Sequence, residues 1–120
     1  MDNNRPVFAQ IMEIIENDIL NETYKTDDLI ISTTMIAKLY SVNPTTAVKA
    51  VSRLTDDGIL YKKPGIGMCV AAGAREKIAQ RRKTAFLGET IDRLLEEANN
   101  LEIPNEELLN LIKERMNQND

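Results

Sequence analysis

The sequence predicts a mostly helical fold with one small β-hairpin, and three observations support this. Apolar residues recur at helical spacing over most of the chain, and two short apolar runs flank the turn-forming segment KKPGIG. The chain has 120 residues, enough for one small domain with an appendage. Because aromatic residues make up only 4% of the chain and Trp is absent, the core must be aliphatic.

Two helices are expected in the first forty residues. The first runs from Val7 to about Leu20, with Pro6 beside its first turn. The polar segment NETYKTDD ends it, and Ser32 can cap a short second helix. The expected apolar faces comprise Val7, Phe8, Ile11, Ile14, Ile15 and Ile19 in the first helix, and Ile36, Leu39 and Tyr40 in the second.

A third helix is expected from Asn43 to about Asp57. Asn43 is a good N-cap acceptor, Pro44 suits the first helical position, and Gly58 can take the left-handed conformation that ends a helix. Only YSV separates the second and third helices, and so short a connection predicts a helix-turn-helix. The expected buried side of the third helix consists of Ala47, Val48, Val51 and Leu54.

The β-hairpin is expected directly after the third helix, with strands at residues 59–61 and 68–70. A hairpin in this position turns the helix-turn-helix into a winged helix, with Lys62 and Lys63 near the tip of the wing. The alternative is that these lysines only protect an edge strand against aggregation.

The remainder of the chain predicts a helical hairpin, with a break at Pro104 and a last helix capped by Asn105. Its first helix is expected over residues 75–99. A helical pair this small cannot bury both of its apolar faces alone, and a symmetric dimer is the commonest solution. We therefore expect a winged helix at residues 1–72 and a dimerisation segment at residues 73–120. The predicted dimer interface consists of Leu87, Ile91, Leu94, Leu95, Leu108, Leu111 and Ile112.

Charge and the first turn of the third helix both favour DNA as a partner. The formal net charge is −4, yet residues 29–75 carry six basic side chains against two acidic ones. The second helix of a helix-turn-helix enters the major groove with its N-terminal end, where small polar side chains permit close approach. Asn43, Thr45 and Thr46 are therefore expected to face the groove, with Lys49 and Arg53 one and two turns further on.

Two absences limit the chemistry. The chain has no histidine, and its single cysteine, Cys69, lies in an apolar run that suits a strand core. His- and Cys-based metal clusters and a nucleophile paired with histidine are thereby excluded, and we expect neither an enzyme nor a cofactor. One unpaired cysteine fits the cytoplasm, and neither a secretory signal nor a membrane-spanning stretch is expected.

The segments PVFAQIMEII, IISTTMIAKLYSVNPTTAVKAVSRLTDDGIL and KKPGIGMCV resemble the DNA-binding domain of the GntR family of bacterial transcription regulators. VNPTT and the helical tail are similar to the small YtrA-type branch, whose tail dimerises. The resemblance implies a dimeric regulator of the repressor type that binds a two-fold symmetric operator with one winged helix per half-site. Regulators of this branch commonly control neighbouring transporter operons in Gram-positive bacteria. Further DNA contacts are implied for Ser32, Thr33, Thr34, Pro44, Gly65 and Gly67.

Several positions depart from the pattern of the family. Two arginines that contact DNA are missing, and each such donor is worth ~1.5–3 kcal/mol where it bonds directly. We therefore expect weaker or differently specified DNA binding that rests more on the lysines. The departures are Thr34 and Pro64 in place of the arginines, Ile31 in place of proline, Met68 in place of threonine, and Glu22 and Asp27 in place of glycines.

Two alternatives stay open. The acidic net charge and the missing arginines also suit a winged-helix adaptor that binds a protein through its helical tail, and the affinity for DNA separates the two functions. A small effector could be held between the tail and the winged helix, with Leu87, Ile91 and Met116 around it, although the same residues suit a dimer core.

Overall fold

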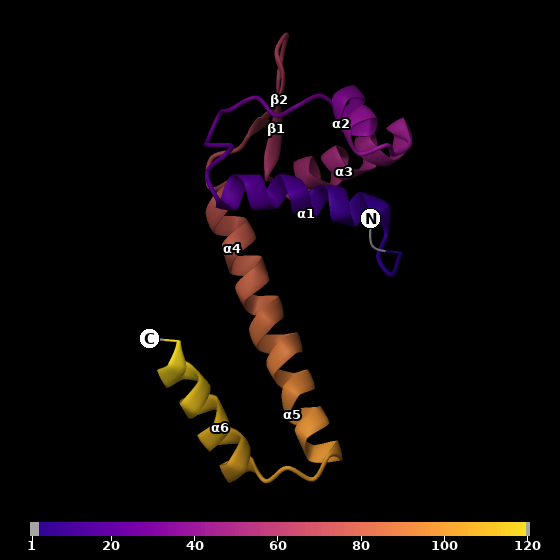
Figure 1. The fold of residues 1–120 in the computed structure, drawn as a ribbon. Helices are drawn as coiled ribbons and strands as arrows, with labels where there is room; N and C mark the ends of the chain where they lie inside the picture. The colour runs from indigo at the N-terminus through magenta and orange to yellow at the C-terminus, as the bar shows by residue number, and fades with distance from the viewer. Residues whose placement is uncertain (1–2, 120) are drawn as a thin grey trace. The chain divides into compact units, whose positions relative to one another are not determined.

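The computed structural model describes residues 3–119, and Figure 1 shows its secondary structure. The chain divides into two compact units, residues 1–81 and residues 82–120. This division by contacts falls inside α4, whereas the predicted functional boundary between residues 72 and 73 stays a prediction. The elements in chain order are α1 (Val7–Leu20), α2 (Thr33–Leu39), α3 (Pro44–Asp56), β1 (Leu60–Lys63), β2 (Gly67–Val70), α4 (Ala74–Ala85), the π-helical segment η1 (Phe86–Thr90), α5 (Ile91–Asn100) and α6 (Asn105–Gln118).

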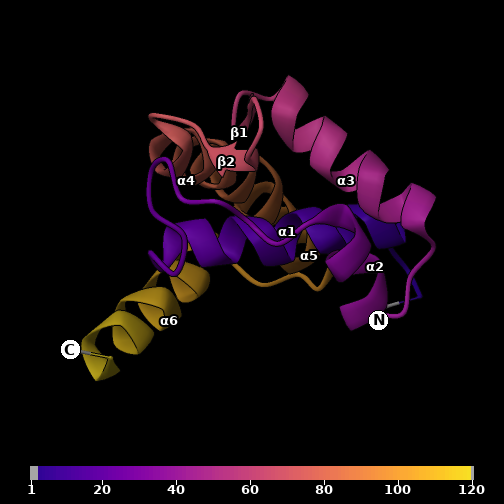
Figure 2. The same ribbon diagram turned by 90° about the horizontal axis from the view of Figure 1, so that it is seen from above.

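The first unit, residues 1–81, is a winged helix, which confirms the predicted fold class. Its helices α1 and α2 both pack against α3, and the strand β1 follows α3 closely, as Figure 2 shows from above. The strands β1 and β2 form a two-stranded antiparallel sheet. The fold therefore places a helix-turn-helix and a wing side by side.

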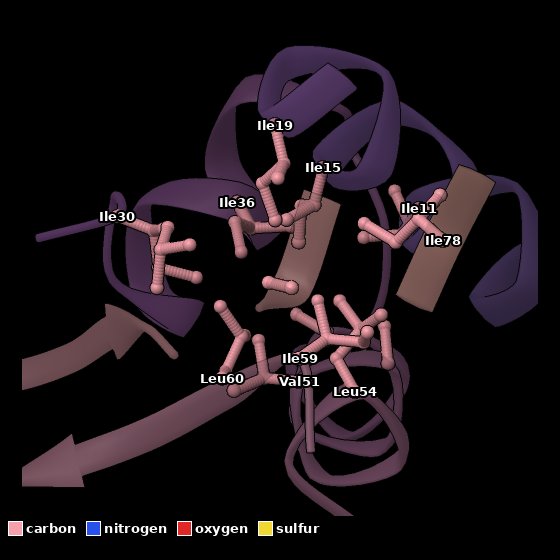
Figure 3. Close-up of a cluster of buried hydrophobic side chains, with 14 of the residues drawn as sticks. Ile11, Ile15, Ile19, Ile30, Ile36, Val51, Leu54, Ile59, Leu60 and Ile78 are labelled. Atoms are coloured by element: carbon pink, nitrogen blue, oxygen red, sulfur yellow. The ribbon is translucent and has the colours of Figure 1, made fainter. Parts of the chain in front are cut away.

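An aliphatic core holds the first unit together, as the composition predicts. Figure 3 shows isoleucine side chains from α1 and α2 meeting residues of α3, the hairpin and α4. No aromatic residue belongs to the buried hydrophobic core of the part that the structure describes. The largest fully buried side chains are Ile11, Ile19, Ile36, Leu54, Ile59, Leu60, Ile78, Val70 and Cys69.

Three apolar residues that the periodicity assigns to helix faces are exposed instead. Val7, Leu39 and Val48 lie at the ends or flanks of the apolar stripes, and Val48 is 52% exposed. In α3 the buried places are taken by Ala47, Ala50, Val51 and Leu54. Sequence spacing predicts a stripe but not its width, because the width depends on what packs against the helix.

The helix caps follow the sequence at two of three positions. The Ser32 hydroxyl accepts a hydrogen bond from the Met35 N–H at 3.1 Å and caps α2. Asn43 caps α3, with Pro44 as its first residue. The prediction that Asn105 caps α6 is wrong, because Asn105 is already the first helical residue and Pro104 holds the extended position before it.

The hairpin is longer than the sequence predicts. Its register pairs Leu60 with Val70, Tyr61 with Cys69, Lys62 with Met68 and Lys63 with Gly67. Both lysines therefore lie within β1, and residues 64–66 form the turn. Cys69 is buried, as expected for a strand-core residue.

The segment between α1 and α2 contains two strained positions. Glu22 and Asp27 have φ angles of 64° and 70°, in the left-handed region that favours glycine. These are the two positions where the family resemblance leads us to expect glycine. Both residues thus hold a left-handed conformation although neither is a glycine.

Asp27 also connects this segment to the wing. The Tyr61 hydroxyl donates a hydrogen bond to the Asp27 carboxylate at 2.7 Å, and the Asp27 N–H donates to the Val70 carbonyl at 2.8 Å. The hydrogen bond to the carboxylate, together with desolvation and the negative charge of Asp27, raises the pKa of Tyr61 to about 12.

The start of α4 is anchored to the first unit by packing and charge. Ile78 is fully buried, and the Arg81 guanidinium pairs with Glu16 of α1, which is only 4% exposed. The same guanidinium lies 4.0 Å from the Asp57 carboxylate, and the Arg75 Nε donates to the Leu20 carbonyl at 3.0 Å. A buried carboxylate needs such a partner, because an unpaired charge is costly away from water.

The second unit, residues 82–120, contains the end of α4, η1, α5 and α6. Helical structure runs without a break from Ala74 to Asn100, close to the predicted range of 75–99, but includes the π-helical turn η1. Among the described residues of this unit, only Ala98 and Leu108 are buried. Among the residues that the structure describes, no helix is both long and apolar enough to span a bilayer.

We predict that Glu22→Gly stabilises the protein by up to about 1 kcal/mol. A left-handed conformation costs a non-glycine residue ~1–2 kcal/mol, and glycine removes this cost. The greater conformational freedom of glycine in the unfolded chain lowers the resulting gain in the free energy of unfolding by ~0.5–1 kcal/mol. Urea unfolding of the purified variants measures the change. Glu22→Ala is the control, since it removes the same charge but keeps the strain. Equal stability of the two variants would contradict the explanation.

Candidate nucleic-acid interface

The N-terminal end of α3 is the centre of the candidate interface. The Asn43 side-chain oxygen accepts a hydrogen bond from the Thr45 N–H at 2.9 Å, which fixes the first turn. This leaves the Asn43 amide group free to donate outward. Thr45 is exposed and Thr46 is half-buried, so a small polar surface is presented at the helix start, as the sequence predicts.

Two cations of α3 lie over an aromatic ring of α1. The Lys49 ammonium is 4.1 Å from the centre of the Phe8 ring, and the Arg53 guanidinium carbon is 5.4 Å from it. Both cations are nevertheless exposed. Phe8 therefore holds two positive charges side by side along one edge of α3. The sequence assigned Phe8 only to the core, because residues 41 and 45 positions apart give no local sign of contact.

The start of α2 presents three residues that the family resemblance assigns to DNA contact. Ser32 uses its oxygen as the helix cap, Thr33 is half-buried, and Thr34 is exposed. Ser32 is therefore occupied by the helix cap and Thr33 is partly covered, whereas the Thr34 side chain is accessible. An arginine at this position would extend into solvent.

The wing presents its two lysines on different faces. Lys62 and Lys63 are both exposed, but successive residues of a strand point to opposite sides of a sheet. Gly65 lies in the turn with a φ of 77°. Gly67 is half-buried, and a Cβ added there would lie 3.0 Å from a Leu29 methyl group. The two glycines thus permit the turn and a close approach of the wing to residue 29.

The structure brings the start of α2 and the wing together around one cavity. The cavity has a volume of about 210 Å³ and an apolar lining, which the sequence did not predict. It joins predicted site residues from both elements, namely Ser32, Thr33 and Gly67. The other lining residues are Leu29, Ile30, Ile31, Val51, Ile66 and Met68.

In the second unit most of the predicted dimer-interface residues are accessible. Leu108 is the exception, because it is only 8% exposed within the unit itself, and Ile112 is half-buried. The predicted residues Leu87, Ile91, Leu94, Leu95 and Leu111 are exposed, and so are Phe86, Leu101, Leu109 and Met116.

Metal-ligating side chains do not gather anywhere in the described residues: no group of three or more His, Cys, Asp or Glu could hold a metal ion there. The interface just described contains amides, hydroxyls, cations and apolar groups. Such a set can recognise phosphates and base edges but supplies no nucleophile paired with a base.

Solved structures that resemble this chain come from transcription regulators. A putative transcriptional regulator of the GntR family from Bacteroides thetaiotaomicron is 29% identical, with a TM-score of 0.81 over 94% of this chain and 99% of its own. AraR(DBD) in complex with operator ORR3 is 30% identical, with a TM-score of 0.51 over 53% of this chain and 77% of its own. BusR from S. agalactiae in complex with its busA-promotor DNA is 26% identical, with a TM-score of 0.56 over 91% of this chain and 57% of its own.

No family model matches the chain, and neither does any curated protein. The likeness to known proteins therefore rests on the winged helix and on solved structures that match over nearly the whole chain. Over that length the chain is similar to transcriptional regulators of the GntR family.

Proposed function

We propose that this protein is a sequence-specific DNA-binding transcription regulator that acts as a homodimer. The proposal is carried by the arrangement at the N-terminal end of α3. There the capped first turn exposes Thr45, and the cations Lys49 and Arg53 follow on the next two turns. The structural likeness to BusR, solved with its promotor DNA, and to AraR(DBD), solved with an operator, supports the same function.

In this mechanism the cations position the protein and the uncharged side chains read the sequence. Lys49, Arg53 and the wing lysines contact phosphates, which carry no sequence information. Asn43, Thr45 and Thr46 contact base edges in the major groove. Because the Asn43 oxygen is occupied by the cap, Asn43 donates from its amide group to an acceptor on a base or phosphate. Ser32, Thr33 and Gly67 line one cavity together with Val51 of α3, and we include the start of α2 and the wing glycines in the DNA-binding surface.

Dimerisation through the second unit would give the protein a two-fold axis that matches a two-fold symmetric operator. Its exposed leucines exceed what a helical pair can bury by itself, and a second copy of the same surface would cover them. Two winged helices related by a two-fold axis bind half-sites about one helical turn, or a multiple of it, apart. We include in the proposal membership of the YtrA-type branch and a repressor role at a transporter operon, as the resemblance implies, and action in the cytoplasm, which the single unpaired cysteine suits.

A winged-helix adaptor is the competing function, and one observation favours it. Leu29, Ile31 and Ile66 are exposed around the cavity between α2 and the wing. Exposed apolar groups of this kind mark protein interfaces as well as ligand sites. An adaptor would show no affinity for DNA beyond weak nonspecific binding at physiological salt.

The decisive experiment is a binding titration of the purified protein with DNA from upstream of its own gene. The titration runs from low to physiological salt, with unrelated DNA as competitor. We expect specific binding that survives competition, at two chains per site. Nonspecific or absent binding at physiological salt would overturn the proposed function in favour of the adaptor.

We predict that Lys63→Ala weakens binding to all DNA sequences alike. The variant loses one phosphate contact in each of the two protomers, which lowers the magnitude of the slope of log K against log salt by about two per dimer. Thr46→Ala should instead change the preference between related operator sequences, because hydroxyl contacts to base edges discriminate. Lys113→Ala, in α6, is the matched control for charge. If Lys63→Ala and Thr46→Ala had the same uniform effect, the division of roles would be wrong.

We also predict that Thr34→Arg tightens binding and steepens its salt dependence by about two units of slope, because each of the two protomers gains one phosphate contact. Thr34 is exposed at the start of α2, where the family usually carries an arginine that contacts DNA. Thr34→Gln is a long but uncharged control and should leave the slope unchanged. An unchanged slope for Thr34→Arg would show that this position does not reach the phosphates.

A further inference from the structure

Val48 is an exposed apolar residue on α3 that the mechanism above does not use. It is 52% exposed, although the helix buries Ala47 and Ala50 on either side of it. The core therefore has no place for Val48, and the valine side chain projects from the surface that would face DNA. An isopropyl group on a groove-facing surface needs an apolar partner in the groove.

Val48 belongs to an uncharged strip along the exposed side of α3. Thr45, Val48 and Ser52 are spaced by three and four residues, so they share one face of the helix, and all three are exposed. All three side chains are short and uncharged. They reach what lies directly beneath the helix, which in a major groove is the edge of a base.

The cations of α3 lie beside this strip rather than on it. Lys49 and Arg53 both lie over the Phe8 ring of α1. Their long side chains suit the phosphates that border a groove, and they leave the strip without charge. The separation makes the strip suitable for reading bases.

We propose that Val48 determines part of the operator sequence by packing against the C5-methyl group of a thymine in each half-site. The thymine methyl is the apolar feature of the major groove, and small apolar side chains recognise it by contact. Cytosine and adenine would instead place an amino group beneath the valine and leave its hydrogen-bonding capacity unmet. This inference rests on the proposed function, because it requires that α3 enters the groove.

The test uses the full-length protein and two forms of its operator. The preferred site is first selected from random DNA with the unchanged protein. Each thymine in the selected site is then replaced by deoxyuridine, which keeps every hydrogen-bonding group and removes only the methyl. We expect one thymine in each half-site whose replacement weakens binding about four-fold. This is the change in affinity that corresponds to the burial of one methyl-sized group.

Variants of the strip link the methyl effect to Val48. In Val48→Ala the same replacement should have no effect on affinity, because the contact is already lost. Alanine is a good helix former and Val48 is exposed, so this variant keeps the fold. Ser52→Ala is the matched control on the same strip and should retain the four-fold loss.

Two results would overturn the inference, and they are distinguishable. If the protein selects a defined site but no thymine methyl matters, or the same thymine matters equally in Val48→Ala, Val48 does not read it and the proposed function stands. If the unchanged protein selects no sequence at all, the proposed function itself fails and the inference fails with it.

Discussion

The packing of α3 against α1 and α2 is the constraint on which the rest of the winged helix depends. Ala47 and Ala50 are fully buried in this contact, and their small side chains let the helices approach closely. Leu54 then fills the core next to Ile59, where the chain enters the hairpin. Because this side of α3 is fixed by packing, the opposite side is fixed as well, and it presents Thr45 and its neighbours to solvent.

The segment between α1 and α2 contains backbone strain, which hydrogen bonds of the same segment offset in part. Two non-glycine residues, Glu22 and Asp27, hold left-handed conformations there. Asp27 offsets its strain by accepting the Tyr61 hydroxyl and by donating its N–H to Val70. The segment thereby ties α1 to both strands of the wing. Hydrogen bonds thus support a left-handed conformation at Asp27, which is not a glycine.

The proposed DNA-binding surface separates charge from sequence reading. Phe8 gathers the two cations of α3 on one edge, and the wing adds two lysines on opposite faces. The uncharged strip of α3, beside the two cations, carries hydroxyls and a valine. Such a surface differs from one with arginines at the start of α2 and in the wing, and in the proposed mechanism it would shift recognition towards apolar and hydroxyl contacts.

Local patterns in the sequence determined the helices, the caps at Ser32 and Asn43, the hairpin and the aliphatic core. They could do so because each of these features depends on residues within a few positions of one another. Only the tertiary structure decided that Val48 is exposed, that Phe8 holds two cations, and that Arg81 pairs with Glu16. Those contacts join residues far apart in the chain, and no spacing rule specifies which side of a helix its distant neighbours will cover.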